Sequence, residues 1–262
     1  MSRLLAIAAL LAALAVACGG DGATPAPGAT SPAAAETKPS AAPTATPPAG
    51  GGQTTDEPVA FETTDGVTVR GHLYTTPGPK RRVVVLAHEF PKDQTAWRDY
   101  ARELAAAGIA ALTLDFRGYG ETGGAREIAK IDLDLDAAVR FVKSRDYPLV
   151  YVIGASIGGT AALKVAARRD LAGVVTISSP SSIMGLDARS DLGNIREPKL
   201  FIAGGRDSAG SYVRVITDEF LPSSPDPKSS RIFEDASEHG TDLLRSAVGA
   251  TLRQLLIDFL TR

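Results

Sequence analysis

Short, continuously apolar segments alternate with segments of helical periodicity from residue 59 to the end of the chain. Runs such as VVVLA, LVYVIG and VVTI show no polar alternation, which is typical of strands that are buried on both faces of a parallel sheet. Strands and helices that alternate in this way indicate the α/β class. The sequence therefore predicts an open, mostly parallel sheet with helices on both faces.

The expected elements follow this alternation along the chain. In sheets of this class, ligands bind at the carboxyl ends of the strands, so candidate functional residues are sought there. We expect strands at residues 67–74, 82–87, 109–115, 149–154, 173–177, 199–203 and 231–233, and helices at 97–107, 128–144, 156–168, 212–220 and 242–260.

The first residues of the chain have the pattern of an export signal. Arg3 precedes an apolar run at residues 4–16, and 13 residues are too few to cross a bilayer. The residues before Cys18 resemble a bacterial lipobox, although Ala15 stands where leucine is usual, and they also fit an ordinary A-x-A cleavage site. We therefore expect a signal peptide over residues 1–17 and a lipidated Cys18 in the cell envelope, on the outer face of a bacterial membrane. The alternative is a secreted, soluble protein.

The segment that follows is unlike the rest of the chain. Of the 38 residues in 19–56, 33 are Ala, Gly, Pro, Ser or Thr, and none is Leu, Ile, Val or Met. Such a segment cannot bury enough apolar surface to offset the entropy of ordering it. We expect residues 18–56 to form a lipidated, disordered tether and residues 57–262 to form one folded domain, which holds all eight Phe, all six Tyr and the single Trp.

Charge and cysteine content narrow the possible partners. The chain has 28 basic and 30 acidic residues, which argues against nucleic acid as a partner. A single cysteine excludes an internal disulfide framework and a multi-cysteine zinc site. We expect contact with a membrane only through the lipid anchor, and the sequence does not set the oligomeric state.

A serine follows one of the apolar strands in a context that favours nucleophilic chemistry. Residues 149–159 read as a buried strand, a G-x-S-x-G turn around Ser156, and the start of an Ala-rich helix. A nucleophilic serine stands on a tight strand-to-helix turn, where small flanking residues let strand and helix approach each other. The alternative is an ordinary small-residue turn, but the flanking strand and helix favour Ser156 as a nucleophile.

An activated serine needs a base and an acid that orients the base. Of the three histidines, His72 lies inside an early strand, His88 ends a strand ahead of the serine, and His239 lies in the loop before the last helix. In hydrolases with a G-x-S-x-G turn the acid and then the histidine follow the serine along the chain, which favours His239. Asp207 follows the strand at 199–203, at the same carboxyl edge of the sheet. The rival acids Asp235 and Glu238 are only four and one residues from His239, which is poor spacing for reaching its ring.

Five motifs in this order resemble the α/β-hydrolase superfamily, over residues 57–262. They are AHEFP at 87–91 in place of the H-G-x-P turn, DFRGYGET at 115–122, GASIGG at 154–159, GRD at 205–207 and HG at 239–240. The resemblance implies an α/β-hydrolase fold, a triad of Ser156, Asp207 and His239, and an oxyanion hole made by the backbone N–H groups of Phe90 and Ile157. It implies no metal and no organic cofactor.

The resemblance also assigns supporting roles and shows two departures. His88 would support the oxyanion turn, and Asp115 and Arg117 would brace a neighbouring loop. Glu89 stands where glycine is usual, and Thr122 where serine is usual. A carboxylate aimed at the oxyanion site would oppose the charge that develops there, so we expect the Glu89 side chain to point away.

The resemblance predicts a small serine hydrolase that cleaves a carboxylic ester or a related acyl bond of a small molecule. The chain resembles dienelactone hydrolases in its size and in lacking a lid, but those enzymes use cysteine at the position of Ser156. Only residues 178–198 lie where many relatives insert a cap, so we expect no sizeable cap and an open site with Met184, Leu186 and Tyr212 in its lining. The alternative is an inactive hydrolase fold that serves as a binding module on the cell surface, since fold alone does not establish function.

Overall fold

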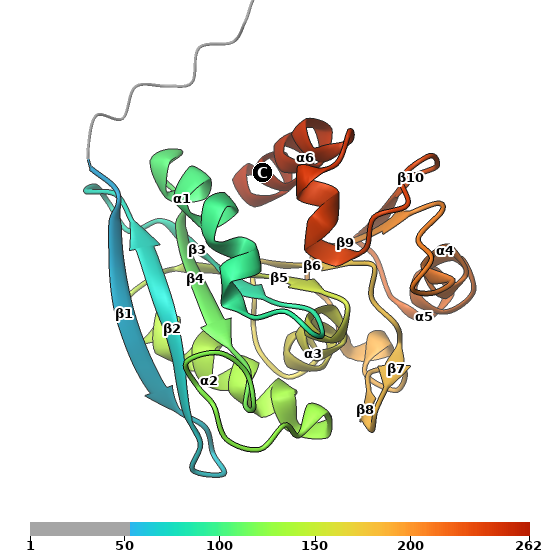
Figure 1. The fold of residues 1–262 in the computed structure, drawn as a ribbon. Coiled ribbons are helices and arrows are strands. Elements are labelled where there is room, and N and C mark those ends of the chain that lie inside the picture. Colours follow the sequence, from blue (N-terminus) through green and yellow to red (C-terminus); the bar gives the residue numbers. More distant parts are fainter. Residues whose placement is uncertain (1–52) are drawn as a thin grey trace, which may run out of the picture. The chain divides into compact units, whose positions relative to one another are not determined.

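The computed structural model describes residues 53–262 (Figure 1). The predicted signal peptide, Cys18 and nearly all of the predicted tether lie outside these residues. The strands are β1 (Thr55–Glu62), β2 (Thr68–Thr75), β3 (Arg82–Ala87), β4 (Ala110–Asp115), β5 (Leu149–Ala155), β6 (Gly173–Ile177), β7 (Ser182–Ile183), β8 (Leu186–Asp187), β9 (Lys199–Gly204) and β10 (Lys228–Phe233). The longer helices are α1 (Arg98–Ala106), α2 (Ile131–Lys143), α3 (Ile157–Ala166) and α6 (Gly249–Thr261).

Eight of the strands form one sheet in the order β1-β2-β4-β3-β5-β6-β9-β10. The pairs β1–β2 and β2–β4 are antiparallel, and all other neighbours are parallel. The sheet is therefore mostly parallel, as the sequence predicts. Its parallel strands end at one common edge, and Ser156 comes directly after β5 at that edge.

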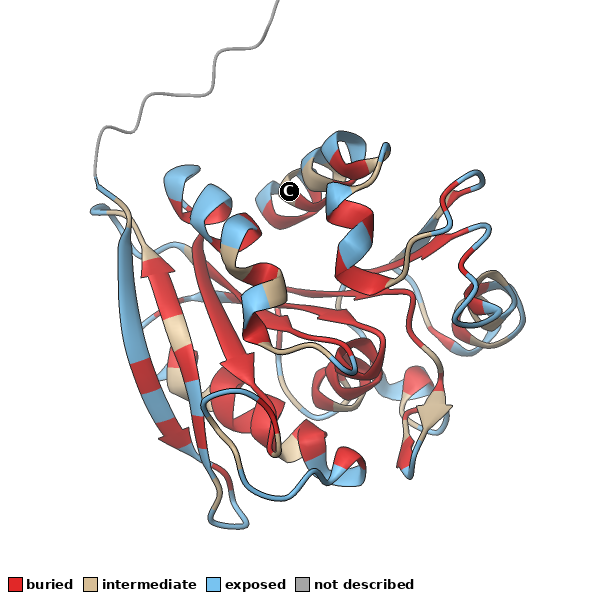
Figure 2. Ribbon diagram, in the orientation of Figure 1, coloured by how far each residue is buried: buried red, intermediate tan, exposed pale blue. Residues whose placement is uncertain are grey.

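Helices cover both faces of this sheet (Figure 1). Along β3, Val83 and Val85 pack in one apolar cluster with residues of α2 and α3, whereas Val84 and Leu86 pack in a second cluster with residues of α1 and α6. The central strands β4 and β6 are accordingly buried along their whole length, and β3 is buried from Val83 to Ala87 (Figure 2). This two-sided burial explains why their sequences are apolar runs rather than alternating patterns.

The last predicted helix is wrong in one respect. Residues 242–260 do not form a single helix: a 3₁₀ helix, η5 (Gly240–Arg245), ends at Ser246, whose backbone is extended, and α6 begins at Gly249. The break lets the chain turn sharply, since a Cβ placed at Gly249 would lie 2.4 Å from the carbonyl oxygen of Leu244. Tight packing between η5 and α6 therefore interrupts a periodicity that looks continuous in the sequence.

The predicted helix at residues 212–220 is helical throughout, but its hydrogen-bonding type changes along its length. A short helical turn, α4 (Tyr212–Arg214), leads into a π-helical turn, η4 (Val215–Phe220), and then into α5 (Leu221–Ser223). Three further 3₁₀ helices connect the elements: η1 (Gln94–Trp97), η2 (Ile128–Lys130) and η3 (Leu192–Asn194).

Three strands were not predicted. β1 begins at Thr55, two residues before the predicted start of the domain, and β7 and β8 form a separate two-stranded hairpin. Together with η3, this hairpin occupies the segment between β6 and β9, so the connection holds no sizeable cap domain. None of the helices within residues 53–262 combines the length and the hydropathy that crossing a bilayer requires.

Candidate active site

The turn between β5 and α3 holds Ser156 in a strained conformation. Its φ is 49° and its ψ is −118°, a region that residues with a side chain rarely adopt. The Ser156 N–H donates to the carbonyl oxygen of Ile177 at 2.9 Å, which fixes the turn to the end of β6. The side chain stands where strand and helix meet, the geometry that a serine nucleophile requires.

Two glycines of the turn are needed because backbones approach each other closely there. A Cβ at Gly154 would lie 2.2 Å from the carbonyl oxygen of Gly158, and a Cβ at Gly158 would lie 2.5 Å from that of Ala87. The helix that follows Ser156 therefore packs directly against the end of β3. This contact places the first N–H groups of α3, which have no partner within the helix, beside the serine.

Asp207 and His239 come together across the carboxyl edge of the sheet. His239 Nδ1 lies 2.8 Å from Asp207 Oδ2, while Asp207 Oδ1 accepts the N–H of Ala209 at 3.0 Å. The Asp207 side chain is buried, with 1% exposed, and that of His239 is half-buried. A carboxylate accepts hydrogen bonds, so Nδ1–H donates to Asp207 and Nε2 is the ring nitrogen left to accept a proton.

Backbone contacts hold the two loops that carry this pair. Gly205 donates to the carbonyl oxygen of Phe233, and Arg206 donates to that of Ala236, both at 2.9 Å. These bonds join the loop after β9 to the loop after β10. They align Asp207 with His239 although the residues are 32 positions apart.

The rival acids lie elsewhere. Asp235 is 87% exposed and forms an ion pair with Arg206 at 2.8 Å. Glu238 accepts the backbone N–H of Ser237 at 3.1 Å. Among the three candidates, Asp207 is the one whose carboxylate contacts the imidazole.

The Tyr212 side chain lies beside His239 and near Ser156. The ring of Tyr212 packs on that of His239, with centroids 5.1 Å apart, and its hydroxyl lies beside the Ser156 hydroxyl. Burial and the nearby Asp207 carboxylate raise the pKa of the Tyr212 phenol, which is therefore neutral at physiological pH. Within the described residues, no direct hydrogen bond joins the side chains of Ser156 and His239. Tyr212 thus lies beside both Ser156 and His239.

The two predicted oxyanion residues lie at the start of α3 and in the turn after β3. Ile157 is the first residue of α3, so its N–H lies at the N-terminus of that helix. Phe90 follows β3 in the turn against which Gly158 packs, and its side chain is 41% exposed. The guanidinium of Arg126 lies over the Phe90 ring at 5.5 Å from its centroid and over the Tyr119 ring at 4.3 Å. Arg126, which the sequence did not single out, therefore lies beside the Phe90 turn.

His88 is buried beneath the oxyanion turn. Its Nε2 accepts the N–H of Phe116 at 3.2 Å, and its Nδ1 lies 3.0 Å from the carbonyl oxygen of Glu89, to which it donates. Burial lowers the pKa of this imidazole, so it is neutral. His88 joins the ends of β3 and β4. His72, in contrast, lies in β2 beside Asp56 at 2.5 Å and Glu121 at 3.3 Å.

Asp115 and Arg117 brace the loop after β4. Asp115 accepts hydrogen bonds from the backbone and side chain of Gln94 and from the N–H of Glu121, each at 2.8 Å. Thr122, the departure from the usual serine, donates its hydroxyl to the Asp115 carbonyl oxygen at 2.7 Å. The threonine hydroxyl therefore makes a bond that a serine hydroxyl also could.

Arg117 is buried between two carboxylates. Its guanidinium contacts Asp65 at 2.7 and 2.9 Å and Asp134 at 2.6 and 2.8 Å. Hydrogen bonding to Arg117 holds the pKa of Asp65 well below its usual range. This network joins the loop after β4 to α2 and to the loop before β2.

One of the three predicted lining residues lies in the core. Leu186 is fully buried in the apolar core, because β8 packs on η2 and α3, and Met184 is 64% exposed. Tyr212, 8% exposed, is the one that reaches Ser156 and His239. The prediction for Leu186 is therefore wrong, since its apolar side chain fills the core rather than a cleft.

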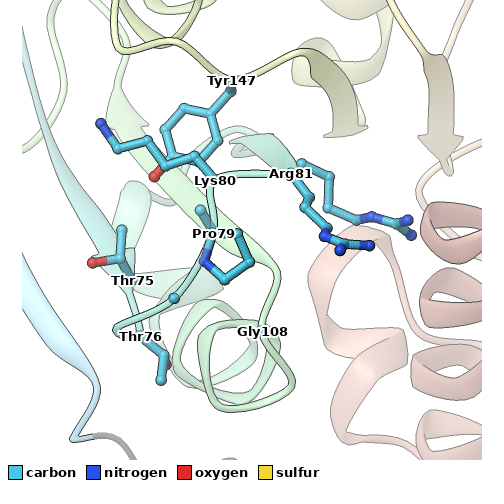
Figure 3. Close-up of a pocket in the computed structure, with 10 residues that line it drawn as sticks. Thr75, Thr76, Pro79, Lys80, Arg81, Gly108 and Tyr147 are labelled. Atoms are coloured by element: carbon cyan, nitrogen blue, oxygen red, sulfur yellow. The ribbon is translucent and has the colours of Figure 1, made fainter.

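A separate hollow lies at the opposite edge of the sheet, where the parallel strands begin (Figure 3). It is lined by Thr75, Lys80, Arg81 and Tyr147 among others, and its volume is about 30 Å³. A wider hollow of about 280 Å³ shares Thr75, Thr76, Gly78, Lys80 and Tyr147 with it, and neither hollow is lined by Ser156, Asp207 or His239. Within residues 53–262, no group of three or more His, Cys, Asp or Glu side chains is arranged to hold a metal ion.

Comparison of sequences finds hydrolases. The family model described as "Serine aminopeptidase, S33" matches residues 78–185. A monoacylglycerol lipase of Mycolicibacterium smegmatis is 30% identical over 115 residues, which are 42% of this chain and 41% of that protein. The match thus spans about two fifths of the length of this relative. An uncharacterized protein of Mycobacterium tuberculosis is 23% identical over 72% of this chain and 75% of its own.

Comparison of structures finds the same fold. An esterase of Pyrococcus furiosus superposes with a TM-score of 0.68 at 21% identity, over 79% of this chain and 92% of the esterase. A dienelactone hydrolase of Anabaena variabilis superposes with a TM-score of 0.66 at 24% identity, over 79% of this chain and 97% of that enzyme. The fold is that of the α/β-hydrolases, as the sequence motifs predict.

Proposed function

We propose that this chain, which has the α/β-hydrolase fold, is a serine hydrolase that cleaves a carboxylic ester or a related acyl bond of a small molecule. The observation that carries the proposal is the 2.8 Å contact between His239 Nδ1 and Asp207 Oδ2, which leaves Nε2 as the ring nitrogen that can accept a proton. The strained turn at Ser156 supports the same assignment. The esterase and lipase relatives support the same reaction class.

In the first step, Ser156 Oγ attacks the acyl carbon while His239 Nε2 takes the hydroxyl proton. Asp207 keeps the imidazole in the required tautomer and stabilises the imidazolium. The N–H groups of Phe90 and Ile157 donate to the carbonyl oxygen, which becomes negative as the new C–O bond forms. The ester C–O bond then breaks, and His239 returns the proton to the leaving alcohol.

In the second step, water replaces the alcohol. The water oxygen attacks the acyl carbon while His239 takes a proton from the water. Collapse of the intermediate then breaks the bond to Ser156 Oγ. Serine regains its proton and the carboxylic acid leaves. The same two backbone N–H groups donate to the oxyanion in this step as well.

The position of Glu89 bears on the alternative of an inactive binding module. A carboxylate aimed at the oxyanion would have favoured that alternative. The Glu89 carboxylate instead accepts hydrogen bonds from Thr241 and pairs with Lys92 at 2.9 Å. This arrangement is compatible with catalysis and supports the enzyme.

The short connection between β6 and β9 supports an open site that admits small acyl substrates. Hydrolysis of p-nitrophenyl acetate and butyrate by the full chain tests the proposal. Ser156→Ala is expected to lower kcat/KM by at least about 10⁴-fold with little change in Tm. Ser178→Ala is a matched control, because Ser178 is also buried and has a φ of 51°, while its hydroxyl has no hydrogen-bond partner within the described residues. Equal activity of Ser156→Ala and the wild type would refute the proposal.

We further propose that the enzyme is exported and held at the cell envelope by a lipid on Cys18. The support is the sequence alone, since Cys18 lies outside the described residues. Mass spectrometry of the mature N-terminus in a bacterial host is expected to find a diacylated Cys18. A mature chain that begins at an unmodified residue, released into the medium, would instead support the secreted form.

A further inference from the structure

Glu89 lies in the oxyanion turn, between His88 and Phe90, at a position where the α/β-hydrolase motif has glycine. Its side chain is buried, with 1% exposed. Burying a carboxylate is costly unless hydrogen bonds or an ion pair compensate for the lost hydration. The partners of this carboxylate therefore indicate what it does.

All partners of Glu89 Oε1 lie on two segments of the site. Oε1 accepts the Thr241 N–H at 3.2 Å and the Thr241 hydroxyl at 2.5 Å, and it lies 2.9 Å from Lys92 Nζ. Thr241 is two residues after His239, and Lys92 is two residues after Phe90. The carboxylate thus joins the segment that carries the base to the segment that carries the oxyanion N–H.

Lys92 adds a second connection between the same segments. Its ammonium lies 2.7 Å from Asp242 Oδ1 and 3.3 Å from Thr241 Oγ1. Burial alone would lower the pKa of Lys92, but the carboxylates of Asp242 and Glu89 outweigh that effect and raise it. Lys92 is therefore a cation at physiological pH and pairs with both carboxylates.

The loop of His239 packs directly on the carboxylate. Gly240 has a φ of +56°, and a Cβ placed there would lie 3.1 Å from Glu89 Cδ. The second carboxylate oxygen, Oε2, is buried without a hydrogen-bond partner within the described residues. The carboxylate is therefore only partly compensated for its lost hydration. Stability alone does not explain its presence, because buried ion pairs contribute little net stability.

We propose that Glu89 is a positioning residue that locks the His239 loop to the oxyanion turn, so that the imidazole and the Phe90 N–H keep a fixed separation around the reacting carbonyl. The inference rests on the proposed serine hydrolase function. It assigns Thr241 and Lys92 as the partners through which Glu89 acts. Displacing either segment would misplace one catalytic group while leaving substrate access unchanged, and a misplacement of about 1 Å can cost about 100-fold in rate.

The experiment measures kcat and KM for p-nitrophenyl acetate and Tm for the full chain and its variants. Glu89→Gln and Thr241→Val are each expected to lower kcat about 10-fold to 100-fold with KM changed less than about two-fold, because they act on geometry rather than on access. The double variant is expected to be no slower than the slower single variant, since both remove the same connection. Thr241→Ser, which keeps the hydroxyl, is expected to keep the wild-type kcat.

Asp134→Asn is the matched structural control. Asp134 is another fully buried carboxylate paired with a cation, Arg117, but its network does not include the His239 loop. It is expected to lower Tm without lowering the kcat of the folded protein. Three results would overturn the positioning role. They are a wild-type kcat in Thr241→Val, losses that add in the double variant, and a loss of kcat in Asp134→Asn as large as that in Glu89→Gln. If the wild type itself shows no hydrolysis that depends on Ser156, the proposed function fails instead.

Discussion

The two turns that meet at the carboxyl edge of the sheet are built in different ways. The turn around Ser156 depends on shape: it has a φ of 49° at the serine and close backbone contacts at Gly154 and Gly158. The turn around Glu89 depends on side chains from distant parts of the chain, including Thr241, 152 residues away. The first is therefore a local property of the sequence, whereas the second exists only once the whole sheet has formed.

The two turns are therefore held in place by different forces. The Ser156 turn is fixed by sterics that tolerate almost no change of residue. The Glu89 turn is fixed by charge and hydrogen bonds, which single substitutions can remove while the backbone stays in place. The effects expected of substitutions therefore range from the loss of a catalytic group to small changes in stability.

Asp207→Asn is expected to have the largest effect. It disturbs the His239 imidazole itself, whereas the other substitutions act on the turns around it. By analogy with the serine protease template, kcat is expected to fall about 10⁴-fold, because an amide cannot hold the same tautomer of His239. The measurement is hydrolysis of p-nitrophenyl acetate by the full chain. Asp235→Asn is the control, because Asp235 is 87% exposed. A larger loss in Asp235→Asn than in Asp207→Asn would exchange their roles.

Gly158→Ala tests the turn built by shape. The new methyl group would lie 2.5 Å from the carbonyl oxygen of Ala87, so α3 and the end of β3 must separate. The free energy of unfolding in urea is expected to fall by about 1–3 kcal/mol. Gly193→Ala is the control, since the nearest atom to its new Cβ is 3.9 Å away. Equal stability of Gly158→Ala and the wild type would show that the turn is not sterically fixed.

Tyr212→Phe tests the residue that lies against both Ser156 and His239. The ring that packs on His239 remains and only the hydroxyl beside Ser156 is lost, so kcat is expected to change by no more than about five-fold. Tyr212→Ala removes the ring as well, and we expect a greater loss of kcat. The pair of variants separates the two contacts in one steady-state assay. Equal kcat values for both variants would show that ring packing on His239 has no catalytic role.

The Glu89 turn is also expected to weaken in mild acid, because it rests on neutral His88. Burial lowers the pKa of His88 in the folded protein below its ordinary value of 6.5, so below that pH the unfolded chain binds a proton that the folded chain does not. Stability is therefore expected to fall as pH drops below about 6.5, with a slope of at most about 1.4 kcal/mol per pH unit from this residue. Urea unfolding between pH 7 and pH 5 measures it. A stability that rises toward pH 5 would contradict a neutral, buried His88.

Much of the fold could be predicted from the sequence because burial on two faces leaves an apolar run. The strands at Arg82–Ala87 and Gly173–Ile177 were predicted to the residue for this reason. β1 was missed because it lies at the edge of the sheet with only Val59 and Phe61 buried, so it carries no such run. The break before α6 was missed because it arises from packing between η5 and Gly249, not from local preference.

In the candidate site, too, some features could be predicted from the sequence and others could not. Ser156, Asp207 and His239 follow strands at one edge of the sheet, so their order and spacing predict that they lie near one another. The sequence also suggested that Glu89 points away from the oxyanion site, and its carboxylate is bonded to Thr241 and Lys92. The identity of those partners was not predictable, because contacts over 152 residues depend on how the loops pack.

Labelling with a fluorophosphonate tests the central claim most directly, since the reagent reports an activated serine without any choice of substrate. The full chain is treated, its intact mass is measured, and a peptide map locates the adduct. The account predicts a single adduct on Ser156 that is lost in His239→Ala, while Ser178 stays unmodified. A folded protein with no adduct, or with an adduct on another serine, would contradict the assignment of Ser156, His239 and Asp207 as the catalytic residues.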